Sequence, residues 1–337
     1  MIKNIKFIEV IVIKKYVDLP EDIEIVEIFG TYNNRAKYLK SKFNVQVSYN
    51  NNKISVSGEN ENDIEKVINI IKEIIDVLSN GHLLDWTEFQ YIVSLYESND
   101  KQNAKSNYNQ VVNTTVSGLR IQAKTHGQSE YIKLMKENDI VFCIGPAGTG
   151  KTYLAVAMAV EYLKTGRVQR IILTRPAVEA GEKLGFLPGT LYDKVDPYLR
   201  PLYDSLMDFM SADKVMEYKE KGIIEVVPLA YMRGRTLNNA FIILDEAQNS
   251  TYYQMKMFLT RIGFNSRAII TGDTTQIDLE NKKDSGLLIV KNILKDINGI
   301  SFIELTENDV VRNPLVKEII KAYDKFERLK GEKYEKK

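Results

Sequence analysis

Apolar and polar residues alternate with two different periods in the first 80 residues of the chain. Residues 21–29 predict a strand, and apolar residues at helical spacing predict a helix over residues 32–43. Residues 45–56 alternate between apolar and polar around an asparagine-rich turn, which predicts a hairpin. Residues 64–78 place their apolar side chains on one face of a further helix. The pattern predicts a small α+β unit.

The order of these elements resembles that of a KH-type RNA-binding module. Such a module uses a Gly-x-x-Gly loop to clamp the backbone of single-stranded nucleic acid. The corresponding segment, Gly30-Thr-Tyr-Asn33, lacks the second glycine and lies in an acidic part of the chain. A packing or assembly role for this unit is favoured, and nucleic-acid binding stays open as the alternative.

A change in composition separates this unit from the rest of the chain. Residues 99–113 are rich in Asn, Gln, Ser and Lys and contain few large apolar residues, as is typical of a linker. We expect a small KH-like domain over residues 1–80 and a linker with a helical part over 81–117. A larger domain is expected over 118–330, followed by a charged tail over 331–337.

From residue 139 onward, predicted strands alternate with predicted helices. Several strands are short, unbroken apolar runs, as expected for strands that are buried on both faces. The predicted strands are residues 140–144, 170–174, 223–227, 241–244, 267–270 and 301–305. This alternation predicts an α/β domain with a parallel sheet and helices on both faces.

The first of these strands runs into a glycine-rich loop that is followed by a helical stretch. The loop consists of Gly145, Pro146, Ala147, Gly148, Thr149, Gly150, Lys151 and Thr152. Glycines allow the backbone N–H groups to converge on phosphate oxygens, and the amino terminus of the helix adds partial positive charge. In such a P-loop the lysine reaches the β- and γ-phosphates and the last hydroxyl ligates Mg²⁺. The segment predicts a nucleotide-binding site.

Two other strands end in polar residues that we expect at the same edge of the sheet. Residues 241–244 run into Asp245 and Glu246, which predicts that Asp245 holds Mg²⁺ and that Glu246 accepts a proton from the attacking water. Residues 267–270 are followed by a polar turn that contains Gln276. We expect Gln276 to contact the γ-phosphate or the water.

Adenine is the favoured base. Asn281-Lys-Lys-Asp284 matches the guanine-reading signature of GTPases, but no apolar strand precedes it, so it is interpreted as a solvated turn. Gln128 lies just upstream of the first strand. A side-chain amide can pair with the N6 and N7 edge of adenine, so Gln128 is the candidate that reads the base.

Composition narrows the setting and the partners. The chain has 337 residues with 44% hydrophobic and 27% charged residues, one cysteine and two histidines, so a disulfide framework is excluded. Neither a membrane helix nor a secretory signal is expected, and a cytoplasmic location fits best. Residues 1–100 carry 11 basic and 16 acidic residues, whereas the remainder carries 35 and 29. The carboxy-terminal part is therefore the better candidate for binding a phosphate backbone.

These motifs strongly resemble the PhoH-like ATPases, whose core is related to that of superfamily-one helicases. Besides the P-loop, the resemblance rests on Thr125-x-Gly-Gln128, Thr174-Arg-Pro-Ala-Val-Glu-Ala-Gly-Glu-Lys-Leu-Gly-Phe-Leu-Pro-Gly189, Asp196-Pro-Tyr-Leu-Arg-Pro201, Met232-Arg-Gly-Arg-Thr236, Leu244-Asp-Glu-Ala-Gln-Asn249, Thr271-Gly-Asp-x-x-Gln276 and Val310-Val-Arg312. It implies a RecA-like core over residues 118–330 that hydrolyses ATP with Mg²⁺ and works on RNA or single-stranded nucleic acid. Residues 1–80 lack the acidic cluster of the PIN nuclease fused to some members. A ribonuclease or ribosome-maturation factor is therefore expected only as a partner.

The resemblance also assigns roles to individual residues. It implies that Thr174 and Arg175 contact nucleic acid and that Arg312 is a catalytic residue near the γ-phosphate. No second RecA-like lobe is expected after Arg312, so an arginine from another subunit is expected to complete the site. The candidates for this role are Arg233, Arg235 and Arg312. Such a heterologous contact closes into a ring, for which six subunits are favoured.

The leading hypothesis is an ATPase that remodels RNA or an RNA–protein complex. Two alternatives stay open: an ATP-dependent scaffold that recruits a nuclease or maturation factor, and a phosphotransferase with a P-loop. A phosphotransferase needs no glutamate beside the aspartate that holds the metal, because its acceptor replaces water. Glu246 therefore favours hydrolysis.

Overall fold

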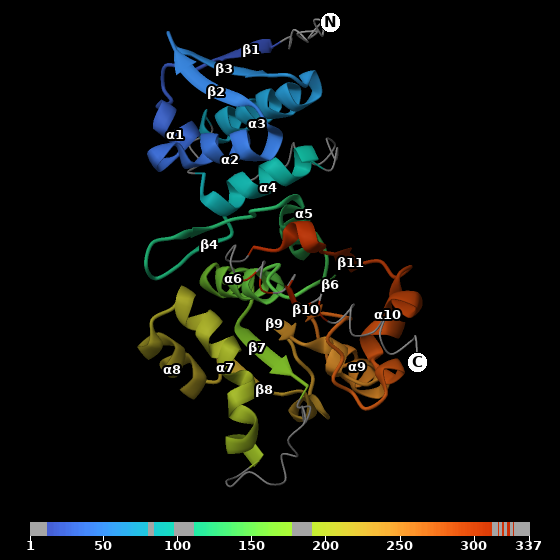
Figure 1. Ribbon diagram of the computed structural model, residues 1–337. Helices are drawn as coiled ribbons and strands as arrows, with labels where there is room; N and C mark the ends of the chain where they lie inside the picture. The colour runs from blue at the N-terminus through green and yellow to red at the C-terminus, as the bar shows by residue number, and fades with distance from the viewer. Residues whose placement is uncertain are drawn as a thin grey trace, which may run out of the picture. The chain divides into compact units, whose positions relative to one another are not determined.

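The computed structural model describes residues 12–79, 84–97, 111–176 and 191–311, together with isolated positions between 316 and 326. The chain divides into two compact units, Met1–Asn109 and Gln110–Lys337 (Figure 1). Each unit has its own hydrophobic core.

The first unit is an antiparallel three-stranded sheet covered by helices. Its sheet has the order β1-β3-β2. Its elements are β1 (Ile13–Asp18), α1 (Ile25–Phe29), α2 (Asn34–Phe43), β2 (Gln46–Asn50), β3 (Lys53–Gly58), α3 (Glu61–Ser79) and α4 (Trp86–Glu97). The predicted hairpin is confirmed as β2 and β3, and the predicted last helix is confirmed as α3.

The strand predicted at residues 21–29 is wrong. Residues 25–29 form helix α1, and the first strand is β1, which pairs with β3. The backbone N–H of Glu24 donates to the carboxylate of Glu27 at 2.9 Å, which satisfies a donor at the start of the helix. The four-residue segment Gly30-Thr-Tyr-Asn33 connects α1 to α2, with Tyr32 94% exposed.

Helix α4, which the sequence placed in the linking segment, packs into the first unit. The ring of Phe89 is fully buried and lies 5.7 Å from that of Tyr38 and 5.2 Å from that of Trp86. The guanidinium of Arg35 donates to the backbone oxygens of Glu27 and Leu84, so it joins the start of α4 to α1. The division between the units therefore falls at residues 109 and 110.

The second unit is built on a six-stranded sheet in which all strands are parallel. Its strands are β6 (Ile140–Ile144), β7 (Arg170–Arg175), β8 (Ile224–Pro228), β9 (Ala240–Leu244), β10 (Arg267–Gly272) and β11 (Ile300–Glu304). Their order is β11-β6-β10-β9-β7-β8. This arrangement confirms the predicted parallel sheet and the α/β class, and it is that of a RecA-like P-loop core.

Helices cover both faces of this sheet, and successive side chains of each strand enter opposite cores. One face packs against α5 (His126–Glu137), α6 (Lys151–Lys164), α7 (Leu191–Phe209) and α8 (Ala212–Glu220). The other packs against α9 (Tyr252–Leu259) and α10 (Gly286–Leu294). In β6, for example, Cys143 faces the core on the α6 side of the sheet and Phe142 faces the core on the α9 side, and both are fully buried. Among the helices formed by described residues, none has the length and apolar content needed to cross a bilayer.

Replacing a central side chain of this sheet should unfold the second unit more readily. Phe142 is fully buried, and its ring stacks on that of Phe302 with centroids 4.6 Å apart. Phe142→Ala should cost about 3–5 kcal/mol through lost burial and the cavity that it leaves. Urea unfolding, monitored by circular dichroism, measures the change in the free energy of unfolding. Phe264→Ala is the control, because this ring is 84% exposed and should change stability by less than about 0.5 kcal/mol. Equal unfolding midpoints for the two variants would contradict the assigned core.

Candidate active site

The P-loop lies between the end of β6 and the start of α6. Gly148 and Gly150 adopt left-handed φ angles of 86° and 78°, which a side chain would disfavour. A Cβ atom on Gly145 would lie 2.5 Å from the backbone oxygen of Leu305, so the loop packs closely on the end of β11. The backbone N–H of Val311 also donates to the oxygen of Gly148 at 2.9 Å. The conformation of the loop is therefore stabilised by contacts with Leu305 and Val311 as well as by its own glycines.

Lys151 is folded into the loop. Its ammonium donates to the backbone oxygens of Gly145 at 2.6 Å and Pro146 at 2.8 Å. Burial lowers the pKa of Lys151, and the carboxylates of Asp273 and Glu246 act in the opposite direction. Lys151 is 9% exposed, and to contact a phosphate it would exchange these carbonyl partners for phosphate oxygens.

Asp245 is the centre of a hydrogen-bonded cluster at the carboxyl end of β9. Its side chain is buried, and one oxygen accepts from the hydroxyls of Thr152 at 2.6 Å and Thr271 at 2.7 Å. The other oxygen accepts from Nε of Arg175 at 2.9 Å and from its Nη2 at 2.6 Å. Mg²⁺ takes oxygen ligands and is usually held by one or two carboxylates together with phosphates. The Thr152 hydroxyl and the Asp245 carboxylate fit this requirement.

The nucleic-acid contacts expected for Thr174 and Arg175 are not supported. Thr174 is fully buried. The guanidinium of Arg175 is bound to Asp245 and also donates to the backbone oxygen of Tyr198 at 2.8 Å. Arg175 further lies 3.5 Å from Glu246. These contacts place the charge of Arg175 inside the nucleotide site, and a contact of Arg175 with nucleic acid stays a prediction.

Glu246 is held by Gln248, a residue that the motif search did not single out. Glu246 has a left-handed φ of 53°, and its side chain is 42% exposed. The Gln248 amide nitrogen donates to Glu246 at 2.6 Å and to the backbone oxygen of Gln276 at 3.1 Å. The Gln248 amide oxygen accepts from the backbone N–H of Asp273 at 3.0 Å. Gln248 thus joins the ends of β9 and β10. The available signal was its place in the motif Leu244–Asn249, directly after the two carboxylates.

Gln276 contacts the same cluster from the turn after β10. Its amide nitrogen donates to the carboxylate of Asp273 at 3.0 Å, and the residue itself is exposed. The structure therefore brings Lys151, Thr152 and Gln276 to one edge of the sheet.

The side-chain amide of Gln128, the candidate for reading the base, is hydrogen-bonded to the backbone at both ends. The side chain is 4% exposed, and its nitrogen donates to the backbone oxygen of Thr149 at 3.0 Å. Its oxygen accepts from the backbone N–H of Lys124 at 2.8 Å. Both ends of the amide are bound to the chain's own backbone, and these bonds tie Gln128 to the P-loop. The amide keeps a second N–H and a second lone pair, so the reading of adenine stays a prediction.

The three candidate arginines lie in different surroundings. Arg235 forms an ion pair with Glu225 at 2.8 Å and is half-buried. Arg233 is exposed. Arg312 falls outside the described residues. Most of the family-specific run from Thr174 to Gly189 also lies outside them, and the ring of six subunits stays a prediction.

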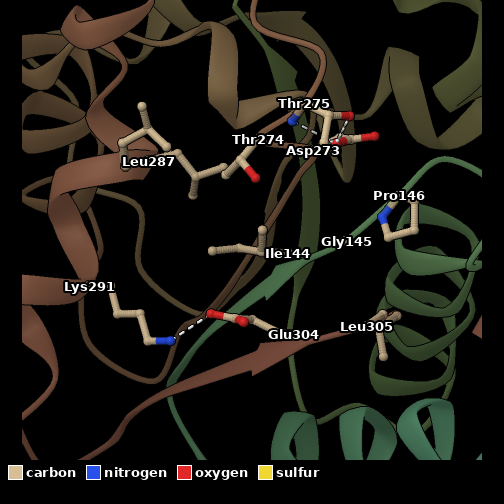
Figure 2. Close-up of a pocket in the computed structure, with 11 residues that line it drawn as sticks. Ile144, Gly145, Pro146, Asp273, Thr274, Thr275, Leu287, Lys291, Glu304 and Leu305 are labelled. Atoms are coloured by element: carbon tan, nitrogen blue, oxygen red, sulfur yellow. Dashed lines mark hydrogen bonds and ion pairs between the residues drawn. The ribbon is translucent and has the colours of Figure 1, made fainter. Parts of the chain in front are cut away.

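A hollow of about 340 Å³ flanks the start of the P-loop on the α10 side of the sheet (Figure 2). Gly145 and Pro146 form one wall, and the Asp273 turn forms another. Across the hollow, Lys291 of α10 pairs with Glu304 of β11 at 2.6 Å. The hollow leaves the first half of the loop accessible from this face.

The parallel sheet, the P-loop and the Thr152–Asp245 pair define a P-loop nucleotide-binding protein with a RecA-like core. A model of the PhoH-like protein family matches residues 120–324, and the chain belongs to that family.

Curated relatives match most of the chain. The PhoH-like protein of Bacillus subtilis (strain 168) is 50% identical over 302 residues, which are 90% of this chain and 94% of that protein. The PhoH-like protein of Mycobacterium tuberculosis (strain H37Rv) is 46% identical over 94% of this chain and 89% of its own. Protein PhoH of Escherichia coli (strain K12) is 43% identical over 206 residues, which are 60% of this chain and 58% of that protein. A Sulfolobus solfataricus SWI2/SNF2 ATPase core solved with dsDNA is similar at 15% identity and a TM-score of 0.34, covering 61% of this chain and 48% of that chain.

If Gln128 acts by positioning the P-loop, Gln128→Ala should weaken nucleotide binding without changing base preference. Loss of the two hydrogen bonds that join the loop at Thr149 to the backbone at Lys124 should lower affinity for ATP and GTP by a similar factor, about tenfold each. Titration with fluorescent ATP and GTP analogues measures both affinities. The control is Gln169→Ala, which removes an exposed amide far along the chain from the loop. A loss of affinity for ATP alone would instead show that Gln128 reads the base.

Proposed function

We propose that this protein hydrolyses ATP with Mg²⁺ and uses the reaction to act on RNA. The observation that carries the proposal is Glu246 beside the buried Asp245 at the edge that holds the P-loop. A carboxylate next to the metal-binding aspartate supports water, and not a second substrate, as the acceptor of the phosphoryl group.

The residues divide the work between binding and proton transfer. The backbone N–H groups of the P-loop bind phosphate oxygens, and Lys151 moves from the loop carbonyls onto the β- and γ-phosphates. Thr152 and Asp245 hold Mg²⁺, which when bound neutralises charge on the phosphates. Arg175 orients Asp245 through its two hydrogen bonds.

Glu246 is the proposed general base. Its side chain is partly exposed, so a water molecule can reach it, and the Gln248 amide fixes one of its oxygens at 2.6 Å. The other oxygen lies 3.5 Å from Arg175. These two contacts orient the carboxylate toward its role as a proton acceptor.

Variants of the two charged residues should separate binding from hydrolysis. Lys151→Ala should abolish detectable ATP binding, because the mobile cation that reaches the β- and γ-phosphates is lost. Glu246→Gln should keep ATP affinity within about twofold and lower the hydrolysis rate by about 10²–10⁴, since only proton acceptance is removed. Equilibrium binding of ATP and release of inorganic phosphate are measured on the same preparations. Equal loss of binding in both variants would contradict the assigned roles.

The RNA part of the proposal is supported by charge and by the family resemblance. Residues 101–337 carry 35 basic and 29 acidic residues, whereas residues 1–100 are net acidic. A polyanion is therefore attracted to the unit that carries the P-loop and not to the first unit.

Single-stranded RNA should raise the ATPase rate of the full chain, and the effect should fall as salt increases. Counterion release makes binding to a phosphate backbone salt-dependent, whereas ATP hydrolysis without RNA should vary much less. Phosphate release is measured with and without a 20-nucleotide RNA at about 50–300 mM KCl. Glu246→Gln serves as the control for contaminating ATPase. An RNA-independent rate at every salt concentration would favour the scaffold or the phosphotransferase instead.

A further inference from the structure

A second hollow of the ATPase unit lies beside α9, and it shares no lining residue with the P-loop or the Asp245 cluster. Its volume is about 460 Å³, and we refer to it as the α9 hollow. Its walls include Arg233, Tyr253, Lys256, Met257, Thr260 and Arg261. Helix α9 and the short segment after β8 bring these residues together.

Three cations and no acidic residue line the α9 hollow. Arg233 and Lys256 are exposed, and none of the ion pairs between described residues involves either of them or Arg261. The next arginine along the chain, Arg235, is paired with Glu225. Unpaired cations that converge on one concave surface attract an anion, and several of them suit a chain of phosphates.

Arg261 is partly committed, and each of its two Nη atoms keeps a second N–H for a ligand. Its Nη1 donates to the backbone oxygen of Arg235 at 3.3 Å, and Nη2 donates to the hydroxyl of Thr260 at 3.2 Å. Its Nε is buried and has no hydrogen-bond partner in the structure. The guanidinium is therefore already oriented by the protein while part of its bonding capacity is unused.

An aromatic ring stands among these cations. Tyr253 is 80% exposed, and Tyr252 packs edge-on against it with centroids 5.4 Å apart. The contact supports the ring of Tyr253 and leaves most of it open to solvent. An exposed, supported ring beside unpaired cations is the arrangement on which single-stranded nucleic acid stacks its bases.

We propose that the α9 hollow binds single-stranded nucleic acid, with a base stacked on Tyr253 and phosphates bound by Arg233, Lys256 and Arg261. The inference deepens the RNA part of the proposed function and rests on it. A second copy of the chain is the alternative occupant, because arginine, tyrosine and methionine are also common in protein interfaces. Single-stranded nucleic acid is favoured because three cations line the hollow with no acidic residue among them. A polyanion needs only the cations that are present.

The α9 hollow is connected to the proposed catalytic residue through a short piece of chain. Helix α9 begins at Tyr252, and the 3-10 turn Ala247–Asn249 that precedes it follows Glu246 directly. Within this turn Gln248 bonds Glu246, as described above. Nucleic acid bound to Tyr253 would thus contact helix α9, and the turn before this helix holds Gln248, which orients Glu246. A shift of α9 on RNA binding could therefore move Glu246 and change the rate of hydrolysis.

The test measures binding of fluorescein-labelled U20 RNA and dT20 DNA to the full chain by fluorescence anisotropy over a salt series. Tyr253→Ala should weaken binding about tenfold through lost stacking. The double variant Arg233→Ala/Lys256→Ala should lower the slope of log affinity against log salt by about 1.4, or about 0.7 for each phosphate contact. Phe264→Ala and Lys295→Ala are matched controls, since each removes an exposed ring or an exposed cation elsewhere on the same unit. Comparison of the two probes shows whether RNA or DNA is preferred.

Three results would overturn the inference, and they differ in what they imply for the proposed function. If wild-type protein binds RNA and all four variants bind with the same affinity and slope, RNA binds elsewhere and the proposed function stands. If wild-type protein hydrolyses ATP but binds neither probe, the inference and the RNA part of the function both fail. If Tyr253→Ala lowers the mass measured by light scattering and leaves RNA affinity unchanged, the α9 hollow is an interface between copies. The far-UV circular dichroism spectrum and the urea unfolding midpoint should be unchanged in all four variants, which shows that they fold.

Discussion

The arrangement of the nucleotide site depends on one buried negative charge, the carboxylate of Asp245. An ionised carboxylate away from water is costly unless hydrogen bonds and an opposite charge compensate it. Its donors come from three separate segments: Thr152 at the start of α6, Arg175 at the end of β7 and Thr271 at the end of β10. Satisfying this charge therefore fixes three loops relative to β9, and the same contacts place the two oxygen ligands offered to the metal.

Two buried side-chain amides complete this frame. Gln128 joins the backbone before α5 to Thr149 in the P-loop, and Gln248 joins Glu246 to the turn after β10. Each amide uses both its donor and its acceptor, so its orientation is determined by the hydrogen bonds around it. The loops that would contact phosphate and water are consequently set before any ligand arrives, which reduces the reorganisation required during the reaction.

The sequence predicted the parts of this structure that depend on local pattern. The apolar runs of the second unit could be placed as strands because each is short and bounded, and the P-loop has a spacing that few other structures share. The prediction for residues 21–29 was wrong because a short segment of mixed apolar and acidic residues suits a strand or a helix equally. The hydrogen bond from the backbone of Glu24 to the side chain of Glu27 stabilises the start of the helix. The partners of Gln128 and Arg175 could not be predicted, since they lie on segments distant in sequence, and only the folded chain shows that their polar groups are already used.

Cys143, the one cysteine of the chain, lies in the middle of β6, directly before the P-loop. It is fully buried, and burial raises the pKa of its thiol well above the ordinary value. Because the thiolate is the reactive form, a disulfide reagent can modify this site only after strand β6 has opened to solvent. The labelling rate of this single thiol would therefore report how often the sheet next to the P-loop opens, which measures the local stability of the second unit.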